Sequence, residues 1–251
     1  MDARRGVFAD FIQTTAILTR IPIGVGAPEP GAVAVGAWAF PLVGAGIGGI
    51  AAFVFFLVEF LGIGAGPAAL LAVLTGIAVT GALHEDGLAD TADGFGGGSD
   101  RAQKLAIMRD SRQGTYGIVA LAASIGLRAA AVAAAPDPIS AGLGLIAAHA
   151  ASRGLLPIPM RLLAPAREDG LGAAAGRPAV SVMIIAAAIG AGIALAALGP
   201  FRGFVALVIA GAAVAMTAFL AQRQIGGYTG DVLGAFQQIG EIVMLLVAAA
   251  R

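Results

Sequence analysis

Apolar stretches of roughly 20 residues recur along the chain and alternate with short polar connections. A helix needs about 20 apolar residues to cross the hydrocarbon core of a bilayer, so each stretch predicts a membrane-spanning helix. We expect their boundaries to hold within several residues. The predicted spans are 38–59, 67–83, 117–135, 140–157, 179–198, 203–221 and 233–250.

The segment before the first span, 7–19, mixes apolar and polar positions and is too short to cross a bilayer. It favours an interfacial or re-entrant helix. Arg4 and Arg5 precede it, but no apolar run with a small-residue cleavage site follows, so we expect no cleaved signal peptide. The fold class is therefore predicted to be all-α: a polytopic integral membrane protein with about seven transmembrane helices and an interfacial N-terminal helix, in a single membrane domain, 1–251.

Composition supports this fold class and excludes several functions. The chain is 59% hydrophobic and 12% charged, whereas a soluble domain carries about 25% charged residues, so the expected solvent is membrane lipid. The absence of cysteine excludes a disulfide framework and a thiolate metal site. A net charge of zero gives no sign of nucleic-acid binding, and no nucleic-acid partner is expected.

The basic residues predict the orientation in the membrane. With the N-terminus inside, the cytoplasmic segments are 1–37, 84–116, 153–178 and 222–232. They contain Arg4, Arg5, Arg20, Arg101, Lys104, Arg109, Arg112, Arg153, Arg161, Arg167, Arg177 and Arg223. The opposite side contains only Arg202 and Arg251, which is the asymmetry of the positive-inside rule. We predict a multi-pass protein of the cell inner membrane with its catalytic face, including an acidic loop at 84–116, in the cytoplasm.

The main candidate for chemistry is the acidic string at 84–94, which follows the second span. Asp86, Asp90 and Asp93 are spaced i, i+4, i+7 and fall within roughly 60° of one another on a helix. Such carboxylates repel one another unless a cation lies against them, and oxygen ligands of this kind suit Mg²⁺. We predict these three as Mg²⁺ ligands and catalytic residues, with His84 beside them. The alternative is a solvated acidic helix end.

Two further polar motifs lie at the starts of spans. The first, at 110–117, contains Asp110 as another candidate catalytic carboxylate and Arg112 as a candidate phosphate clamp. The second, at 226–231, ends in Asp231. The candidate substrate-binding residues in the two motifs are Ser111, Arg112, Gly114, Thr115, Tyr116, Thr229 and Asp231. Each motif also has a structural alternative. The motif at 110–117 could be a turn with an interfacial tyrosine, and the motif at 226–231 could be a helix N-cap.

Other polar residues have mainly structural readings. Ser99 or Asp100 is placed to cap a helix that starts at Arg101. Arg128 and Glu241 lie within predicted spans, where buried charges are expensive, so they are candidates to pair with each other. His149 is more consistent with a hydrogen bond between helices than with a metal ligand.

The strings at 84–94 and 110–117 resemble those of the cobalamin synthase family, the adenosylcobinamide-GDP ribazoletransferases. Stretches at 18–22, 40–44 and 227–231 also match, so the resemblance covers nearly the whole chain. Glu85 is a position that we expect to vary in this family.

The resemblance implies an enzyme that transfers phosphocobinamide from adenosylcobinamide-GDP to α-ribazole or α-ribazole 5′-phosphate. GMP leaves, and adenosylcobalamin or its 5′-phosphate forms. The resemblance also implies Mg²⁺ as the cofactor, and other cobalamin-assembly enzymes are candidate partners. Attack on a pyrophosphate needs neutralisation of charge on the transferring phosphoryl group, which carboxylate-held Mg²⁺ supplies.

Two alternatives remain open from the residues. Another Mg²⁺-dependent membrane phosphotransferase, such as a CDP-alcohol phosphatidyltransferase, also uses aspartates at helical spacing, but its usual Asp-Gly string continues to Ala-Arg, whereas Ala89 here is followed by Asp90. A secondary transporter places charges near the membrane midplane and often contains inverted repeats, and no repeat is evident.

Overall fold

The computed structural model describes residues 6–26 and 29–250. Apart from one isolated bridge between Pro165 and Tyr228, these residues form only helices and connections. The helices are α1 (Val7–Leu18), α2 (Ala32–Gly36), the 3₁₀ helix η1 (Ala37–Ala39), α3 (Phe40–Phe60), α4 (Ala65–Thr80), α5 (Leu83–Gly97), α6 (Arg101–Ile107), α7 (Thr115–Ala133), α8 (Pro138–Leu155), α9 (Pro157–Leu162), α10 (Gly170–Ala174), α11 (Val180–Leu198), α12 (Pro200–Ile225) and α13 (Gly230–Ala249).

The predicted all-α membrane fold is confirmed. By length and composition, six helical stretches of the described chain can cross a membrane, and a seventh span results if α4 and α5 count as one broken segment. Each predicted span corresponds to a helix, namely α3, α4, α7, α8, α11, α12 and α13 in chain order, and α1 covers the predicted N-terminal helix.

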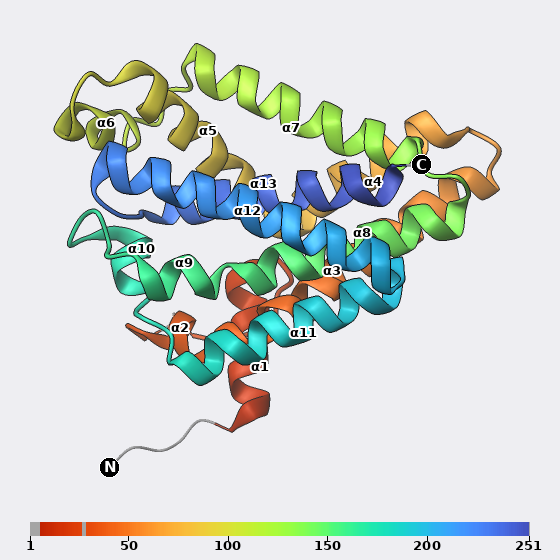
Figure 1. The fold of residues 1–251 in the computed structure, drawn as a ribbon, viewed down its shortest axis with the longest axis horizontal. Helices are drawn as coiled ribbons and strands as arrows, with labels where there is room; N and C mark the ends of the chain where they lie inside the picture. Colours follow the sequence, from red (N-terminus) through yellow and green to blue (C-terminus); the bar gives the residue numbers. More distant parts are fainter. Residues whose placement is uncertain (1–5, 27–28, 251) are drawn as a thin grey trace.

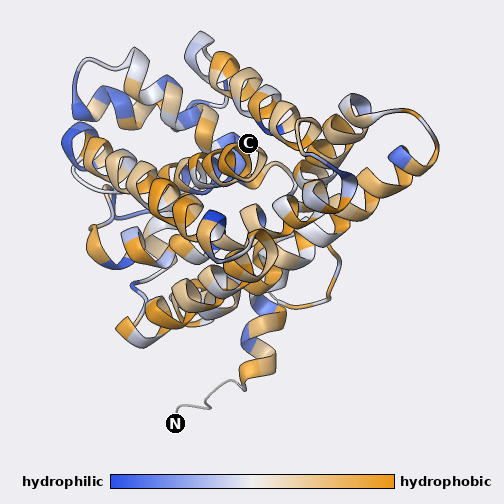
Figure 2. Ribbon diagram, turned by 45° about the vertical axis from the view of Figure 1, so that its right-hand side comes forward, coloured by the Kyte–Doolittle hydropathy of each residue, from blue (hydrophilic) through white to orange (hydrophobic). Residues whose placement is uncertain are grey.

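The polar motifs gather at one end of the helix bundle. Figure 1 shows α5, α6, α10 and the turn from α12 to α13 at one end, whereas the connections after α3, α7 and α11 and the end of α13 lie at the other. The long helices are mainly hydrophobic, and hydrophilic positions are concentrated around α5 and α6 (Figure 2). Residues from distant parts of the sequence can therefore build one polar site.

Helix α8 forms the centre of the bundle and packs against α3, α11 and α13. The prediction that Arg153 lies in a cytoplasmic loop is wrong, because this residue belongs to α8 and is only 1% exposed. α8 and α9 together form one apolar helical stretch, Pro138–Leu162, so the polar connection begins later than the apolar pattern predicts. Arg4, Arg5 and Arg251, three of the residues that predict the orientation, lie outside the described residues.

The predicted acidic loop at 84–116 is mostly helical. It contains α5, which bends by 92° from α4, then α6 and a short turn before α7. Asp100 caps α6 as predicted, because its carboxylate accepts the backbone N–H of Gln103 at 2.9 Å. The side chain of Gln103 in turn accepts the N–H of Ser99 at 2.7 Å.

Candidate active site

A sharp bend at Gly81 and Ala82 turns α5 away from α4. Both residues have left-handed backbones, with φ of 64° and 59°, and the second is the only described non-glycine residue with a positive φ. A left-handed alanine costs about 1–2 kcal/mol, so surrounding contacts must hold it in place. Arg20 provides one of them: its N–H donates to the carbonyl of Val79 at 2.7 Å, and its side chain packs against Gly81.

Two glycines allow α5 and α13 to approach each other closely. A Cβ atom on Gly87 would lie 2.6 Å from the carbonyl oxygen of Asp231, and one on Gly234 would lie 3.0 Å from that of His84. Any larger residue at Gly87 would have to separate the two helices, because the obstacle is backbone. This contact brings Asp231 to the helix that carries Asp86 and Asp90.

Three carboxylates then influence one another electrostatically. Asp86 is exposed, and Asp90, one helical turn further on, is half-buried. Burial, together with the negative charges of Asp86 and Asp231, raises the pKa of Asp90 to about 6. No ion pair to Asp86 or Asp90 is present in the described part of the chain, so the site has an excess of negative charge.

The predicted third metal ligand, Asp93, has a different environment. Its two oxygens accept the backbone N–H groups of Gly114 at 2.7 Å and Gly117 at 2.9 Å, and the side chain is buried. A Cβ atom on either glycine would lie only 2.4 Å from these oxygens. The carboxylate therefore holds the N-terminus of α7, where N–H groups otherwise lack partners and the helix dipole favours negative charge.

The carboxylate set consequently differs from the predicted one. Among the described residues, no three of His, Asp and Glu are arranged to hold a metal ion together, so Asp86, Asp90 and Asp93 do not form a three-ligand site. Two carboxylates without ion-pair partners do fit Mg²⁺, which commonly takes one or two carboxylates and completes its coordination shell with water and substrate phosphates. Asp86 and Asp90, which have no ion-pair partner among the described residues, are the candidates for such a pair.

Asp231 is held in place by its neighbours and is not the N-cap of α13. That cap is Thr229, whose hydroxyl accepts the N–H of Val232 at 3.3 Å. The same hydroxyl donates to Asp231 at 3.0 Å, and Arg167 forms an ion pair with Asp231 at 3.2 Å. The structure thus gives Thr229 a capping role and leaves Asp231 facing the site. Arg167, one of the basic residues of the predicted cytoplasmic segment 153–178, lies beside the site because the bridge between Pro165 and Tyr228 joins its segment to the start of α13.

The motif before α7 lies at the same end of the molecule but is more exposed. The guanidinium of Arg112 donates to Asp110 at 3.0, 3.2 and 2.6 Å, and the backbone N–H of Arg112 donates to it at 3.0 Å. These hydrogen bonds lower the pKa of Asp110 to about 2. Ser111 and Thr115 are also exposed. Tyr116, 58% exposed, packs with its ring against Gly96. The link to the carboxylates is Gln113, whose amide donates to Asp90 at 3.4 Å.

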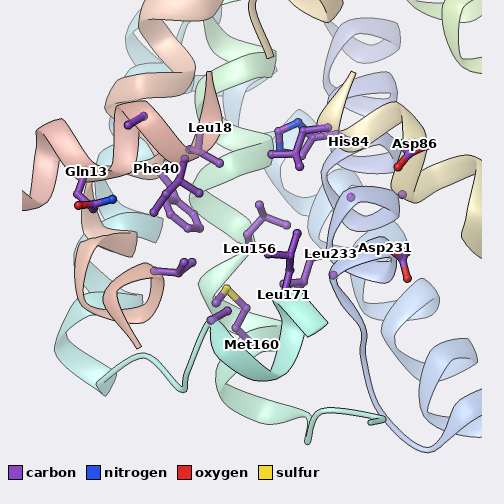
Figure 3. Close-up of a pocket in the computed structure, with 18 of the residues that line it drawn as sticks. Gln13, Leu18, Phe40, His84, Asp86, Leu156, Met160, Leu171, Asp231 and Leu233 are labelled. Carbon is purple, nitrogen blue, oxygen red and sulfur yellow. The ribbon is translucent and has the colours of Figure 1, made fainter. Parts of the chain in front are cut away.

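A cavity of about 480 Å³ opens beside the carboxylates. Its wall is formed by α1, α3 and the 156–175 segment on one side and by α5 and α13 on the other. His84, Asp86 and Asp231 lie at the α5–α13 side of the cavity (Figure 3). His84 is 4% exposed, and its Nδ1 atom has no hydrogen-bond partner.

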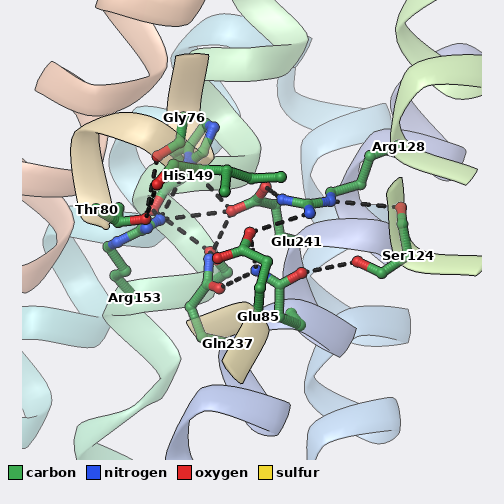
Figure 4. A network of polar contacts seen from close by, with 12 residues as sticks. Gly76, Thr80, Glu85, Ser124, Arg128, His149, Arg153, Gln237 and Glu241 are labelled. Atoms are coloured by element: carbon green, nitrogen blue, oxygen red, sulfur yellow. Dashed lines mark hydrogen bonds and ion pairs between the residues drawn. The ribbon is translucent and has the colours of Figure 1, made fainter. Parts of the chain in front are cut away.

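Behind α5 lies a buried network of charges that joins α5, α7, α8 and α13 (Figure 4). Arg128 forms ion pairs of 3.0 Å with both Glu85 and Glu241, which confirms the expected pairing with Glu241 and adds a second partner. Glu241 also lies 3.0 Å from His149 and 3.5 Å from Arg153. The two arginines and the two glutamates of this network balance each other in charge, as a low-dielectric interior requires.

The sequence reasoning missed part of this network. Glu85, which we expect to vary in this family, is 5% exposed and links the acidic helix to α7 through Arg128. Gln237 donates to Glu241 at 2.5 Å and Gln238 donates to Glu85 at 3.0 Å, and neither residue is among the predicted polar partners. Two adjacent glutamines inside an apolar span do indicate a buried polar network, because side-chain amides need hydrogen-bond partners within a membrane. His149 is an interhelical partner, as expected.

Comparison with known proteins identifies the family. The model of the family described as cobalamin-5-phosphate synthase matches residues 10–249. A Bradyrhizobium diazoefficiens protein named adenosylcobinamide-GDP ribazoletransferase is 50% identical over 247 residues, covering 98% of this chain and 95% of that protein. Proteins with the same name from Mesorhizobium japonicum and Azorhizobium caulinodans are 45% and 44% identical, over 98% and 96% of this chain and 94% and 95% of their own lengths.

No solved structure matches the chain significantly. The family model nevertheless spans all the motifs that build the site, from the α1 segment to Asp231 on α13, and three similar proteins align with almost their whole lengths. The chain therefore belongs to the cobalamin-5-phosphate synthase family.

Proposed function

We propose that this protein is an adenosylcobinamide-GDP ribazoletransferase, which joins α-ribazole or its 5′-phosphate to the phosphocobinamide part of adenosylcobinamide-GDP. The observation that carries the proposal is the family match over residues 10–249, together with relatives of that name that are 44–50% identical over nearly the full chain. These names give no support to a transporter or to another membrane phosphotransferase.

The reaction is a phosphoryl transfer with a balanced course. A ribose hydroxyl of the acceptor attacks the phosphorus that carries cobinamide. A new oxygen–phosphorus bond forms, the bond from this phosphorus to the bridging oxygen of the pyrophosphate breaks, and GMP leaves. The hydroxyl proton passes to a carboxylate. Asp231 suits this role because it lines the cavity, and Arg167 and Thr229 hold its orientation.

Asp86 and Asp90 would hold Mg²⁺ in this proposal. Their excess negative charge supports it, since a carboxylate whose pKa rises to about 6 is poorly compensated by the protein alone. When bound, the ion would neutralise charge on the pyrophosphate. Arg112 and the backbone around Gly114 to Tyr116 stay candidates for contacts with the donor, at the exposed edge of the site.

The proposed setting is the cell inner membrane, with the site on the cytoplasmic side. The clustering of the polar motifs at one end of the bundle supports a single aqueous face, and the bias of Arg and Lys toward that end supports its orientation. Membrane lipid would surround the long helices, and enzymes of cobalamin assembly are candidate partners on the cytoplasmic face.

The test is turnover by the purified full-length protein in detergent. Adenosylcobinamide-GDP and α-ribazole are supplied with Mg²⁺, and GMP and the corrinoid product are quantified by chromatography. We expect GMP release that depends on α-ribazole, stops with EDTA and is strongly reduced in Asp86→Asn. Folded wild-type protein that releases no GMP under these conditions would refute the proposed function.

A further inference from the structure

The cavity beside the carboxylates has two chemically different ends. Its greater part is apolar, formed by side chains from α1, α3, the α8–α9 junction, α10 and α13, as Figure 3 shows. These side chains include Leu18, Phe40, Leu156, Met160, Leu171 and Leu233. The other end is polar and contains His84, Asp86 and Asp231. A ligand that fits must therefore have an apolar part and a polar part.

The charge of the lining restricts the ligand further. Among the described residues that line the cavity, two are carboxylates and none is Arg or Lys. Asp231 already has Arg167 as its ion-pair partner, and this arginine does not line the cavity. Unless Mg²⁺ is bound, a phosphate group inside the cavity would therefore face the negative charge of Asp86, which is unfavourable in a partly enclosed site. Neutral hydroxyl groups, in contrast, can donate hydrogen bonds to carboxylates. The polar end thus suits a sugar rather than a phosphate.

Size separates the two substrates of the proposed reaction. A volume of about 480 Å³ lies within the roughly 300–1,000 Å³ of sites for small ligands. A nucleoside fits such a space, whereas a corrin ring with its amide side chains is several times larger and must remain outside. Only the acceptor nucleoside, or the guanosine part of the donor, is small enough to enter.

The bases of these two nucleosides differ in polarity. Guanine has several donors and acceptors along its edge, and each would lose its water without gaining a partner against leucine, phenylalanine and methionine side chains. The benzimidazole base of ribazole has methyl groups and a single free ring nitrogen, so its burial against this wall is favourable. The apolar end therefore discriminates in favour of the acceptor.

We propose that this cavity is the acceptor subsite, which binds the benzimidazole base of α-ribazole between α1, α3 and the 156–175 segment; the inference rests on the proposed function. The base lies in the apolar end, and the ribose hydroxyls lie at Asp86 and Asp231. A 5′-phosphate, when present, points out of the cavity. The interfacial helix α1 thereby becomes part of the substrate site.

Filling the apolar end tests the proposal. Ala16 lines the cavity from α1 and is only half-buried, so Ala16→Phe adds a ring to the cavity without displacing core packing. Ala16→Leu adds a smaller side chain, in case the larger one impairs folding. We expect the KM for α-ribazole to rise in the order Ala, Leu, Phe, by on the order of tenfold or more for Phe. The KM for adenosylcobinamide-GDP and the inhibition by GMP should remain unchanged.

Ala9→Phe is the matched control, since Ala9 is exposed on the same helix and does not line the cavity. It should keep the parent KM values for both substrates. A folded Ala16→Phe protein with an unchanged KM for α-ribazole overturns the proposal. A weaker inhibition by GMP in this variant also overturns it, because the cavity would then hold guanine.

Calorimetry with α-ribazole alone separates this inference from the proposed function. Binding to the parent protein that is lost in Ala16→Phe supports the cavity even if no GMP is released. If the parent protein turns over but binds α-ribazole with the same affinity as Ala16→Phe, the proposed function stands and the proposed subsite is refuted. Absence of both turnover and α-ribazole binding in folded parent protein refutes both.

Discussion

The buried charge network leads to a quantitative prediction about Arg128. This guanidinium is shared by Glu85 and Glu241, and the three side chains are 2%, 7% and 2% exposed. Arg128→Met keeps most of the apolar stem but removes the charge. Two carboxylates then face a single buried arginine, Arg153, which lies 3.5 Å from Glu241. Glu85 keeps only the amide of Gln238, and its Oε2 atom already lacks a hydrogen-bond partner.

The size of the effect follows from this loss of balance. Removing one partner of a buried ion pair costs about 3–5 kcal/mol, because the remaining charge is left uncompensated. For a chain of this length, one kcal/mol corresponds to about 2–4 °C, so the melting temperature should fall by roughly 6–20 °C. The double variant Arg128→Met/Glu85→Gln restores charge balance, since Arg153 then faces Glu241 alone. It should therefore lose less stability than the single variant.

The assay is thermal unfolding in detergent, followed by the fluorescence of the single tryptophan, Trp38, and by size-exclusion chromatography. Leu127→Met is the control, because Leu127 is 44% exposed on the same helix and the change conserves volume. It should unfold within about 0.5 kcal/mol of the parent. An Arg128→Met protein as stable as this control, or a double variant no more stable than the single one, would contradict the proposed charge balance.

Three further predictions concern the site and the topology. Asp86→Asn should raise the Mg²⁺ concentration needed for half-maximal turnover. Asp93→Asn should instead lower the free energy of unfolding by about 1 kcal/mol, because an amide keeps one acceptor oxygen for the two N–H groups of Gly114 and Gly117, and added Mg²⁺ should not restore it. Equal responses of the two variants to Mg²⁺ would contradict the two roles. Gly87→Ala should abolish most turnover by separating α5 from α13, while Gly66→Ala, where a Cβ meets open space, should remain as active as the parent. Ser99→Cys introduces a single cysteine into a chain that has none. An impermeant maleimide should label this cysteine in inverted membrane vesicles but not in intact cells, and labelling of intact cells would reverse the predicted orientation.

The sequence alone determined those features that depend on residues close to one another along the chain. The spans follow from local runs of apolar residues, and the helices appear within a few residues of their predicted ends, because a backbone in lipid must satisfy its hydrogen bonds internally. The cap of α6 by Asp100 is equally local. The family could be recognised because the strings at 84–94 and 110–117 are contiguous.

Only the tertiary structure decided which of these residues meet. Helical periodicity placed Asp86, Asp90 and Asp93 on one face, but the contact with α7 turned Asp93 into a helix cap. Close packing at Gly87 brought Asp231 to α5 from more than 140 residues away in the chain. Span order does not specify which helices are neighbours. Which helices pack against each other depends on the shapes and buried charges of whole helix faces. These faces combine residues from distant parts of the chain, so a local sequence pattern does not predict the neighbours.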